Sequence, residues 1–250
     1  MMPLTRLSEE PYASILCYPR SSKAEVGHRL KELQKLGIEA LEFSGDKEAF
    51  GVRVLGKGCV GIVVKAFVKE NEIALKIRRV DADRVKMQHE SEMLRKANSV
   101  EVGPELLGVS RNFLLMQFID GDLFPHWLER RLRKDLVKRV LRQILEQCRR
   151  MDEAGLDHGE LSFAPKHVIV DRTNAPVIVD FETASVNRRP SNVTSICQYL
   201  FFSGETAKKV SEKLGEKAAS EVVEALRRYK QDRNRENFER VLRVCGLQTM

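Results

Sequence analysis

The stretch LGKGCVGIVVKAFVKENEIALK, residues 55–76, decides the fold of this chain. It contains three glycines, Gly56, Gly58 and Gly61, then a β-branched run and a second apolar run that ends at Lys76. Glycines permit tight turns and let backbone N–H groups approach a bulky anion closely. A lysine one strand later can contact the same anion from the side. The stretch therefore predicts a phosphate-binding hairpin.

The spacing of these glycines also occurs in dinucleotide-binding folds, where the third glycine opens a helix. Here the residues after Gly61 are β-branched and a second strand-like run follows, so a hairpin is favoured. An ordinary glycine-rich surface hairpin with an exposed lysine is the alternative that this stretch leaves open.

Length and composition bound the class of protein. A chain of 250 residues can form one large domain or two small lobes. The formal charge is +7, but 32% of all residues are charged, which indicates an ion-paired, solvated surface more than a dedicated polyanion site. The five cysteines are widely separated, and no apolar run approaches membrane-spanning length. These features predict a soluble cytoplasmic protein without a disulfide framework.

The first 50 residues precede the glycine stretch and carry no chemical motif. We predict a short strand over residues 12–18, a helix capped by Ser21 or Ser22, and a strand over residues 38–43. This lead-in unit, residues 1–50, is expected to pack on the first lobe. A separate recognition element is the alternative.

A helix capped by Asp81 or Asp83 and running to about Ala97 is predicted next. Its periodicity places Glu90 within the apolar stripe. A buried carboxylate without a partner is costly, and Lys76 is the predicted partner. Alternatively, Glu90 lies at the edge of the stripe and reaches water.

The chain then changes from strands to helices. Two further strands are predicted over residues 104–109 and 113–119, and a helical region extends from Trp127 to Gly155. Between His126 and Arg150, nine residues are Arg or Lys and three are Asp or Glu. Such a helix is usually a solvated face, so nucleic-acid binding is an alternative that we do not favour.

Two acidic residues flank a pair of apolar β-rich runs. Glu160 precedes the run at residues 168–170, and the run at residues 177–179 leads directly to Asp180. If the two runs form a hairpin, both acids lie at one end of it. A lysine for phosphate and a carboxylate for Mg²⁺ are the groups that phosphoryl transfer requires.

With these motifs, the chain resembles the protein-kinase-like phosphotransferases over residues 55–200, in particular the RIO kinases and the small kinase associated with tRNA threonylcarbamoylation. The resemblance implies an α+β bilobal fold with an antiparallel sheet in the N-lobe and a mostly helical C-lobe. The implied N-lobe covers residues 51–120 and the implied C-lobe residues 121–250. The expected ligands are ATP and Mg²⁺ or Mn²⁺.

The resemblance also implies roles for individual residues. Lys76 would contact the α- and β-phosphates, Glu90 would hold Lys76, and Met116 would guard the adenine pocket. The backbone of Gln117 and Ile119 would contact the adenine edge. The nucleotide site implied in this way comprises Gly56, Lys57, Gly58, Cys59, Gly61, Val63, Lys76, Glu90, Met116, Gln117 and Ile119. Glu160, Lys76 and Asp180 would be catalytic.

The catalytic loop departs from the family pattern at two positions. Glu160 stands where the family has aspartate, and His167 stands where it has asparagine if two residues are inserted. His167 would join Asp180 as a metal ligand and would favour Mn²⁺, because imidazole suits Mg²⁺ less well than oxygen does. A histidine in a turn that binds no metal is the alternative.

After Asp180 the sequence has no long activation segment, because residues 192–202 already have a helical pattern. Regulation by phosphorylation of a loop is therefore not expected. Arg188 and Arg189 lie in the shortened segment and either receive an acidic or phosphorylated substrate or are simply exposed without a ligand.

The predicted activity is transfer of the ATP γ-phosphate to a serine or threonine hydroxyl of a protein, or of this chain itself. The alternatives are an ATP-binding switch module without catalysis, a small-molecule kinase, and a protein that binds RNA or a ribonucleoprotein with ATP as a regulator.

Overall fold

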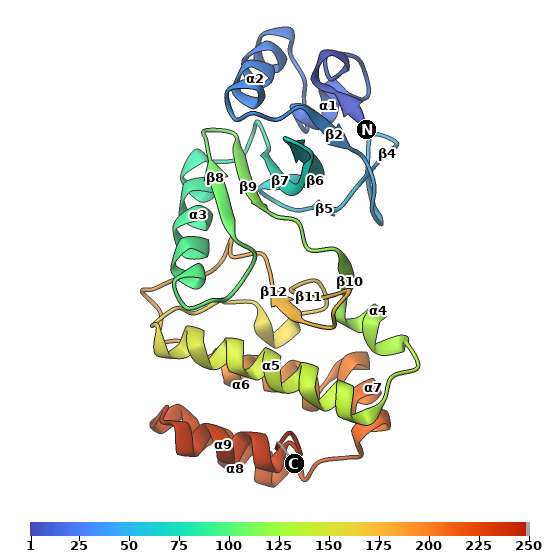
Figure 1. Ribbon diagram of the computed structural model, residues 1–250. Coiled ribbons are helices and arrows are strands. Elements are labelled where there is room, and N and C mark those ends of the chain that lie inside the picture. The colour runs from blue at the N-terminus through green and yellow to red at the C-terminus, as the bar shows by residue number, and fades with distance from the viewer. Residues whose placement is uncertain (249–250) are drawn as a thin grey trace. The chain divides into compact units, whose positions relative to one another are not determined.

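The computed structural model describes residues 1–248, with all side chains except those of residues 84–86. The chain divides into two compact units. Unit 1 comprises Met1–Leu94 and Pro104–Phe118, and unit 2 comprises Arg95–Gly103 and the chain from Ile119 onward. Figure 1 labels most of the helices and strands of each unit.

Unit 1 is built on an antiparallel sheet with strand order β1-β2-β6-β7-β9-β8, in which β5 also pairs with β6 (Figure 1). The strands of this sheet are β1 (Met2–Pro3), β2 (Ala40–Glu42), β5 (Gly56–Lys57), β6 (Gly61–Val68), β7 (Asn71–Arg78), β8 (Leu106–Val109) and β9 (Phe113–Gln117). A separate hairpin and the helices are β3 (Lys47–Ala49), β4 (Val52–Val54), η1 (Leu4–Arg6), α1 (Tyr12–Leu16), α2 (Lys23–Lys35) and α3 (Arg84–Asn98).

The centre of this sheet is the hairpin of β6 and β7. Its register places Lys76 opposite Val63 on one side and opposite Leu114 of β9 on the other. Ile62, Leu75 and other apolar side chains of the strands are buried in the core of unit 1. The β-branched run after Gly61 thus forms a central strand, as its composition predicts.

The predicted strand over residues 12–18 is wrong, because this segment contains the short helix α1. Its first turn is closed by the hydrogen bond from Ala13 N to Glu9 O, and Pro11 lies just before the helix, where its missing N–H is tolerated. Ile15 and Leu16 are buried. A short apolar run cannot be assigned to helix or strand by periodicity alone, which explains the error.

The residues that precede the glycine hairpin belong to unit 1 and are connected to its sheet by a buried arginine. Arg29 of α2 is fully buried. Its guanidinium donates to Leu16 O at 2.8 Å, Arg78 O at 2.6 Å and Asn112 Oδ1 at 3.3 Å, and it pairs with Glu25 at 2.8 Å. This single side chain links α2 to the end of β7 and to the turn before β9.

Unit 2 consists mainly of helices and contains a small antiparallel sheet with strand order β10-β11-β12. Its strands are β10 (Gly121–Leu123), β11 (Val168–Asp171) and β12 (Pro176–Ile178). Its helices are α4 (Phe124–Glu129), α5 (Lys134–Glu153), η2 (Leu161–Phe163), α6 (Asn192–Phe201), α7 (Gly204–Leu214), α8 (Ala219–Gln231) and α9 (Arg235–Val244). The predicted helical region that starts near Trp127 is interrupted between α4 and α5.

The apolar face of α5 forms the core of unit 2. Every residue that the periodicity assigns to this face is buried: Val137, Val140, Leu141, Ile144, Cys148 and Met151. An antiparallel sheet in the N-terminal part and helices in the C-terminal part confirm the predicted α+β, kinase-like bilobal fold class. Across the described residues, no helix combines the length and the apolar character needed to cross a membrane.

Candidate active site

The glycine hairpin consists of β5, a turn and β6. The turn is closed by the hydrogen bond from Gly58 N to Gly61 O at 2.9 Å. A Cβ atom at position 61 would lie 2.5 Å from Ile77 O, so only glycine fits there, whereas a Cβ atom at position 58 would make an ordinary contact with Gly61 O at 3.8 Å. Lys57 at the end of β5 and Cys59 in the turn are exposed, and Val63 is half-buried on β6. The hairpin thus presents an exposed turn next to a closely packed strand.

Lys76 and Glu90 form the ion pair that the sequence predicts. Lys76 Nζ and Glu90 Oε2 are 2.6 Å apart, and the side chains are 7% and 3% exposed. Glu90 is on the buried face of α3, whereas Glu92 on the same helix is exposed. The low exposure excludes the alternative that Glu90 reaches water at the edge of the stripe. Because both charges are desolvated, each depends on the other.

The residues predicted to contact adenine lie on and just after β9. Met116 is half-buried and packs on a small cluster formed by Val60, Met87 and Leu114. The N–H of Gln117 already donates to Glu105 O at 2.9 Å, so an adenine contact at this residue would use its carbonyl. Ile119 belongs to unit 2 and begins its second segment.

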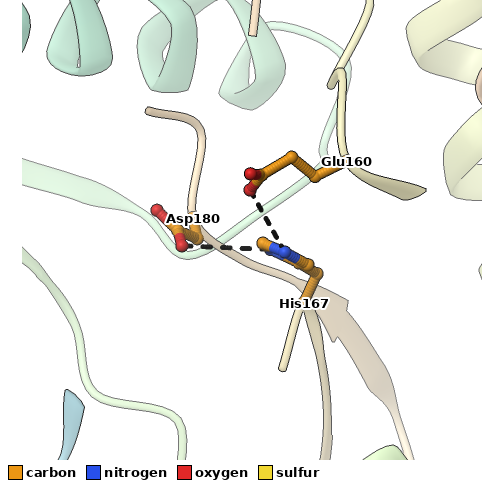
Figure 2. A group of neighbouring side chains, drawn as sticks. All are labelled: Glu160, His167 and Asp180. Carbon is orange, nitrogen blue, oxygen red and sulfur yellow. Dashed lines mark ion pairs between the residues drawn. The ribbon is translucent and has the colours of Figure 1, made fainter. Parts of the chain in front are cut away.

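The strands β11 and β12 pair as the predicted hairpin, and the two acids lie near one end of it (Figure 2). Glu160 precedes η2, and Asp180 follows β12 in a left-handed backbone conformation with φ of 70°. His167 lies between them, immediately before β11. Its Nε2 is 3.2 Å from Glu160 Oε2, and its Nδ1 is 3.9 Å from Asp180 Oδ2. One ligand atom from each of the three residues fits within 4.8 Å.

The protonation of His167 follows from these neighbours. The ring is 1% exposed, and burial lowers the pKa of His167 despite the opposing carboxylates of Asp180 and Glu160. A neutral imidazole carries one N–H and one lone pair, so one of the two ring nitrogens is available as an electron-pair donor. In the described part of the chain, Nδ1 of His167 makes no hydrogen bond. This nitrogen lies on the side of the ring that faces Asp180 Oδ2.

A model of the RIO domain matches residues 62–196, more than half of the chain. The chain belongs to the RIO domain family. This is an atypical protein-kinase-like family, so the resemblance to RIO kinases is confirmed. A search of the curated proteins finds no match. Membership of this family implies a kinase-like phosphotransferase, and such proteins generally use ATP and a divalent metal.

In this RIO domain protein, Glu160, His167 and Asp180 offer donor atoms that suit a divalent cation. His167 Nδ1 is buried, makes no hydrogen bond in the described part of the chain and lies 3.9 Å from Asp180 Oδ2, so a cation bound there would find an imidazole nitrogen and a carboxylate oxygen close together. Glu160 supplies a further carboxylate on the other side of the imidazole. A ligand set of one imidazole and carboxylates suits Mn²⁺ better than Mg²⁺.

The sequence-based interpretation of this RIO domain missed two residues of the site. Lys166 Nζ is 3.8 Å from Asp180 Oδ2, and its side chain is 64% exposed. Asp157 has an almost buried carboxylate that pairs with Arg188. The sequence signal for Lys166 is its position directly before His167, but no pattern connects Asp157 with a residue 31 positions away.

Arg188 and Arg189 both have partners within unit 2. Arg188 binds Asp157 and Thr183 O, and Arg189 donates to Lys230 O at 2.7 Å. Both side chains nevertheless remain partly open to solvent. Their contact with an acidic or phosphorylated substrate stays a prediction, and both guanidinium groups have structural roles within unit 2.

Proposed function

We propose that this RIO domain protein is a serine/threonine protein kinase that transfers the γ-phosphate of ATP to a hydroxyl of another protein or of its own chain. The observation that carries the proposal is the convergence of Glu160, His167 and Asp180 at one end of the β11–β12 hairpin, within 4.8 Å. The buried Lys76–Glu90 pair supports it, because a fixed ammonium group suits the phosphates of a nucleotide. We place the protein in the cytoplasm, where ATP is available.

Each residue has a defined task in this proposal. Lys76 binds the α- and β-phosphates, and Glu90 keeps its ammonium group in position. Asp180 and His167 hold the metal ion, which would neutralise charge on the phosphates when bound. Lys166 provides a further positive charge beside Asp180. Glu160 orients the acceptor hydroxyl and accepts its proton.

The side chain of Glu160 is one methylene longer than the aspartate of the family pattern. This methylene moves the carboxylate by about 1.5 Å, a displacement that can cost on the order of a hundredfold in rate if nothing compensates it. The residues between Glu160 and His167, which include η2, are where the chain can compensate. We therefore expect Glu160→Asp to be slower than the wild type, not faster.

The proposal is tested with Glu160→Gln, Glu160→Asp and Asp180→Asn, assayed for phosphate transfer and for metal-assisted ATP binding. Asp180→Asn should lose both, because it removes a metal ligand. Glu160→Gln should bind ATP with Mn²⁺ as the wild type does and lose transfer by at least about 100-fold. Wild-type transfer should be faster with Mn²⁺ than with Mg²⁺.

A second candidate function is an ATP-binding switch module that does not phosphorylate. It is favoured by the contact between Glu160 and His167 at 3.2 Å, which engages the proposed base. A wild-type protein that binds ATP with Mn²⁺ but transfers no phosphate to itself, to a protein mixture or to water would support this candidate and contradict the kinase.

A further inference from the structure

The segment that follows Asp180 is held against the catalytic loop by one arginine. Arg188 Nε donates to Asp157 Oδ2 at 2.9 Å, and Arg188 Nη2 donates to Thr183 O at 2.6 Å. One planar guanidinium therefore binds a carboxylate three residues before Glu160 and a carbonyl three residues after Asp180. Arg188 thus joins the two segments that carry the catalytic acids.

Further hydrogen bonds lie around this arginine. Asp157 and Ser185 exchange backbone hydrogen bonds in both directions, at 2.9 and 2.8 Å. Thr183 Oγ1 donates to His158 O at 3.0 Å, and Ser191 N donates to Asp157 Oδ1 at 3.2 Å. The segment from Thr183 to Ser191 is therefore attached at both ends to the residues that lead into Glu160.

Gly159 allows this close approach. Its φ is 92°, a left-handed conformation that favours glycine. A Cβ atom there would lie 2.6 Å from Arg188 Nη2 and 3.0 Å from Thr183 O. Arg188 therefore occupies the space beside the backbone directly before Glu160, where no side chain at position 159 could fit.

The carboxylate of Asp157 needs this arginine. Its side chain is 11% exposed, so loss of the guanidinium would leave a nearly buried negative charge with only neutral donors. Arg188 itself is about half exposed, at 49%. An arginine at the surface can therefore be removed without opening a hole in the core, but its removal changes the environment of a buried charge.

We infer that Arg188 is a positioning residue that fixes Glu160 relative to Asp180. An internal ion pair, and not a phosphorylated loop, would then hold the site in its active geometry. The inference rests on the proposed function, since it explains how the two acids of that site stay in register. Displacing a catalytic carboxylate by about 1 Å is enough to cost on the order of 100-fold in rate. The acceptors of this arginine are Asp157 Oδ2 and Thr183 O, so it acts through the residues that flank the two acids.

The inference is tested with Arg188→Ala and Arg188→Lys, with Arg189→Ala as the matched control. Arg189 is the adjacent exposed arginine and donates to Lys230 O. Arg188→Ala should lower kcat by about 10- to 100-fold while KM for ATP changes less than about 2-fold. The kcat of Arg188→Lys should lie between those of the wild type and Arg188→Ala, because one ammonium group cannot replace the two guanidinium donors to Asp157 and Thr183. Added guanidinium ion should partly restore the rate of Arg188→Ala, and Arg189→Ala should behave as the wild type.

Amide hydrogen exchange gives a readout that needs no catalysis. The backbone amide hydrogens of Asp157 and Ser185, which form the reciprocal hydrogen bonds, should exchange with solvent at least about 10-fold faster in Arg188→Ala than in the wild type. If the wild type transfers no phosphate but these amides exchange faster in Arg188→Ala, the proposed function fails and the positioning role of Arg188 stands. If Arg188→Ala keeps wild-type exchange and kcat, or if Arg189→Ala loses as much, the inference is wrong. Should Arg188→Ala not fold, the same two measurements on Arg188→Lys decide.

Discussion

At the scale of single residues, the buried ion pair between Lys76 and Glu90 gives a direct prediction for nucleotide binding. Lys76→Ala should weaken ATP binding. Combining it with Glu90→Ala should weaken binding little further, because the two residues act as one unit. The measurement is a double-mutant cycle on the Kd for ATP. The exposed Glu92→Ala on the same helix is the control. Fully additive losses would show that Glu90 does not act through Lys76.

His158 links the site to the pH dependence of stability. Its Nε2–H donates to Val179 O at 3.1 Å, and the ring is completely buried. Burial, with the nearby His167 as a second cause, lowers the pKa of His158 to about 4. The unfolded chain binds a proton below about pH 6.5, but the folded chain does not until about pH 4. The free energy of unfolding should therefore fall as the pH drops through this window.

The expected loss is about 1.4 kcal/mol per pH unit for this one histidine between pH 6.5 and 4. It is measured by urea unfolding at several pH values. His158→Asn, which can still donate to Val179 O, should make the profile shallower. The exposed His126→Asn should leave it unchanged, and equal slopes for the wild type and His158→Asn would contradict the assignment.

The sequence predicts the residues of the site better than it predicts the contacts between them. Glu90 can be assigned to Lys76 because helix periodicity shows that it is buried and a buried carboxylate needs a partner. The proximity of Asp157 and Arg188 depends on how the chain returns after β12. No local pattern encodes such a contact.

At the scale of elements, the basic segment of α4 and α5 is partly neutralised. Arg130 pairs with Asp122, Arg150 pairs with Glu101 at 2.9 Å, and Arg149 contacts Glu146 and Glu153. These pairs lower the positive charge that the sequence count suggests. They are consistent with a solvated face and do not by themselves test nucleic-acid binding.

We predict that this segment is not a nucleic-acid site. Charge reversal at Arg130, Arg131, Arg133 and Lys134 should leave any RNA binding, measured between about 50 and 200 mM salt, unchanged within experimental error. Tight binding at low salt, with a steep salt dependence that the reversal abolishes, would contradict this prediction.

Secondary structure follows from the sequence where the pattern is long. The glycine hairpin, α2 with its Ser22 cap, and the apolar face of α5 all lie where periodicity and capping place them. The segment of α1 has five helical residues, too few for periodicity to distinguish helix from strand. Tertiary packing decides such segments.

At the scale of the whole molecule, the first 50 residues are an integral part of unit 1. Arg29 is fully buried and donates to backbone carbonyls of two other segments. Arg29→Met should lower the free energy of unfolding of unit 1 by about 3–5 kcal/mol, because several buried acceptors lose their donor together. The exposed Lys31→Met on the same helix should change it by less than about 0.5 kcal/mol.

Urea unfolding combined with hydrogen exchange at β7 measures this effect within unit 1. Deletion of residues 1–50 should be more damaging still, since it removes β2, which pairs with β6. A truncated chain in which the amides of β6 stay as protected as in the full chain would show that the lead-in is dispensable for the sheet.

The cysteines offer a practical consequence. Cys17, Cys148, Cys197 and Cys245 are buried, and burial raises the pKa of Cys17 to about 11, whereas Cys59 is exposed in the turn between Gly58 and Val60. A thiol-reactive dye should therefore label Cys59 first in the native protein. Placed at the tip of the glycine hairpin, such a dye would change its fluorescence when a nucleotide covers or orders the turn. The chain thus carries its own attachment point for an optical binding assay, without the introduction of a single new residue.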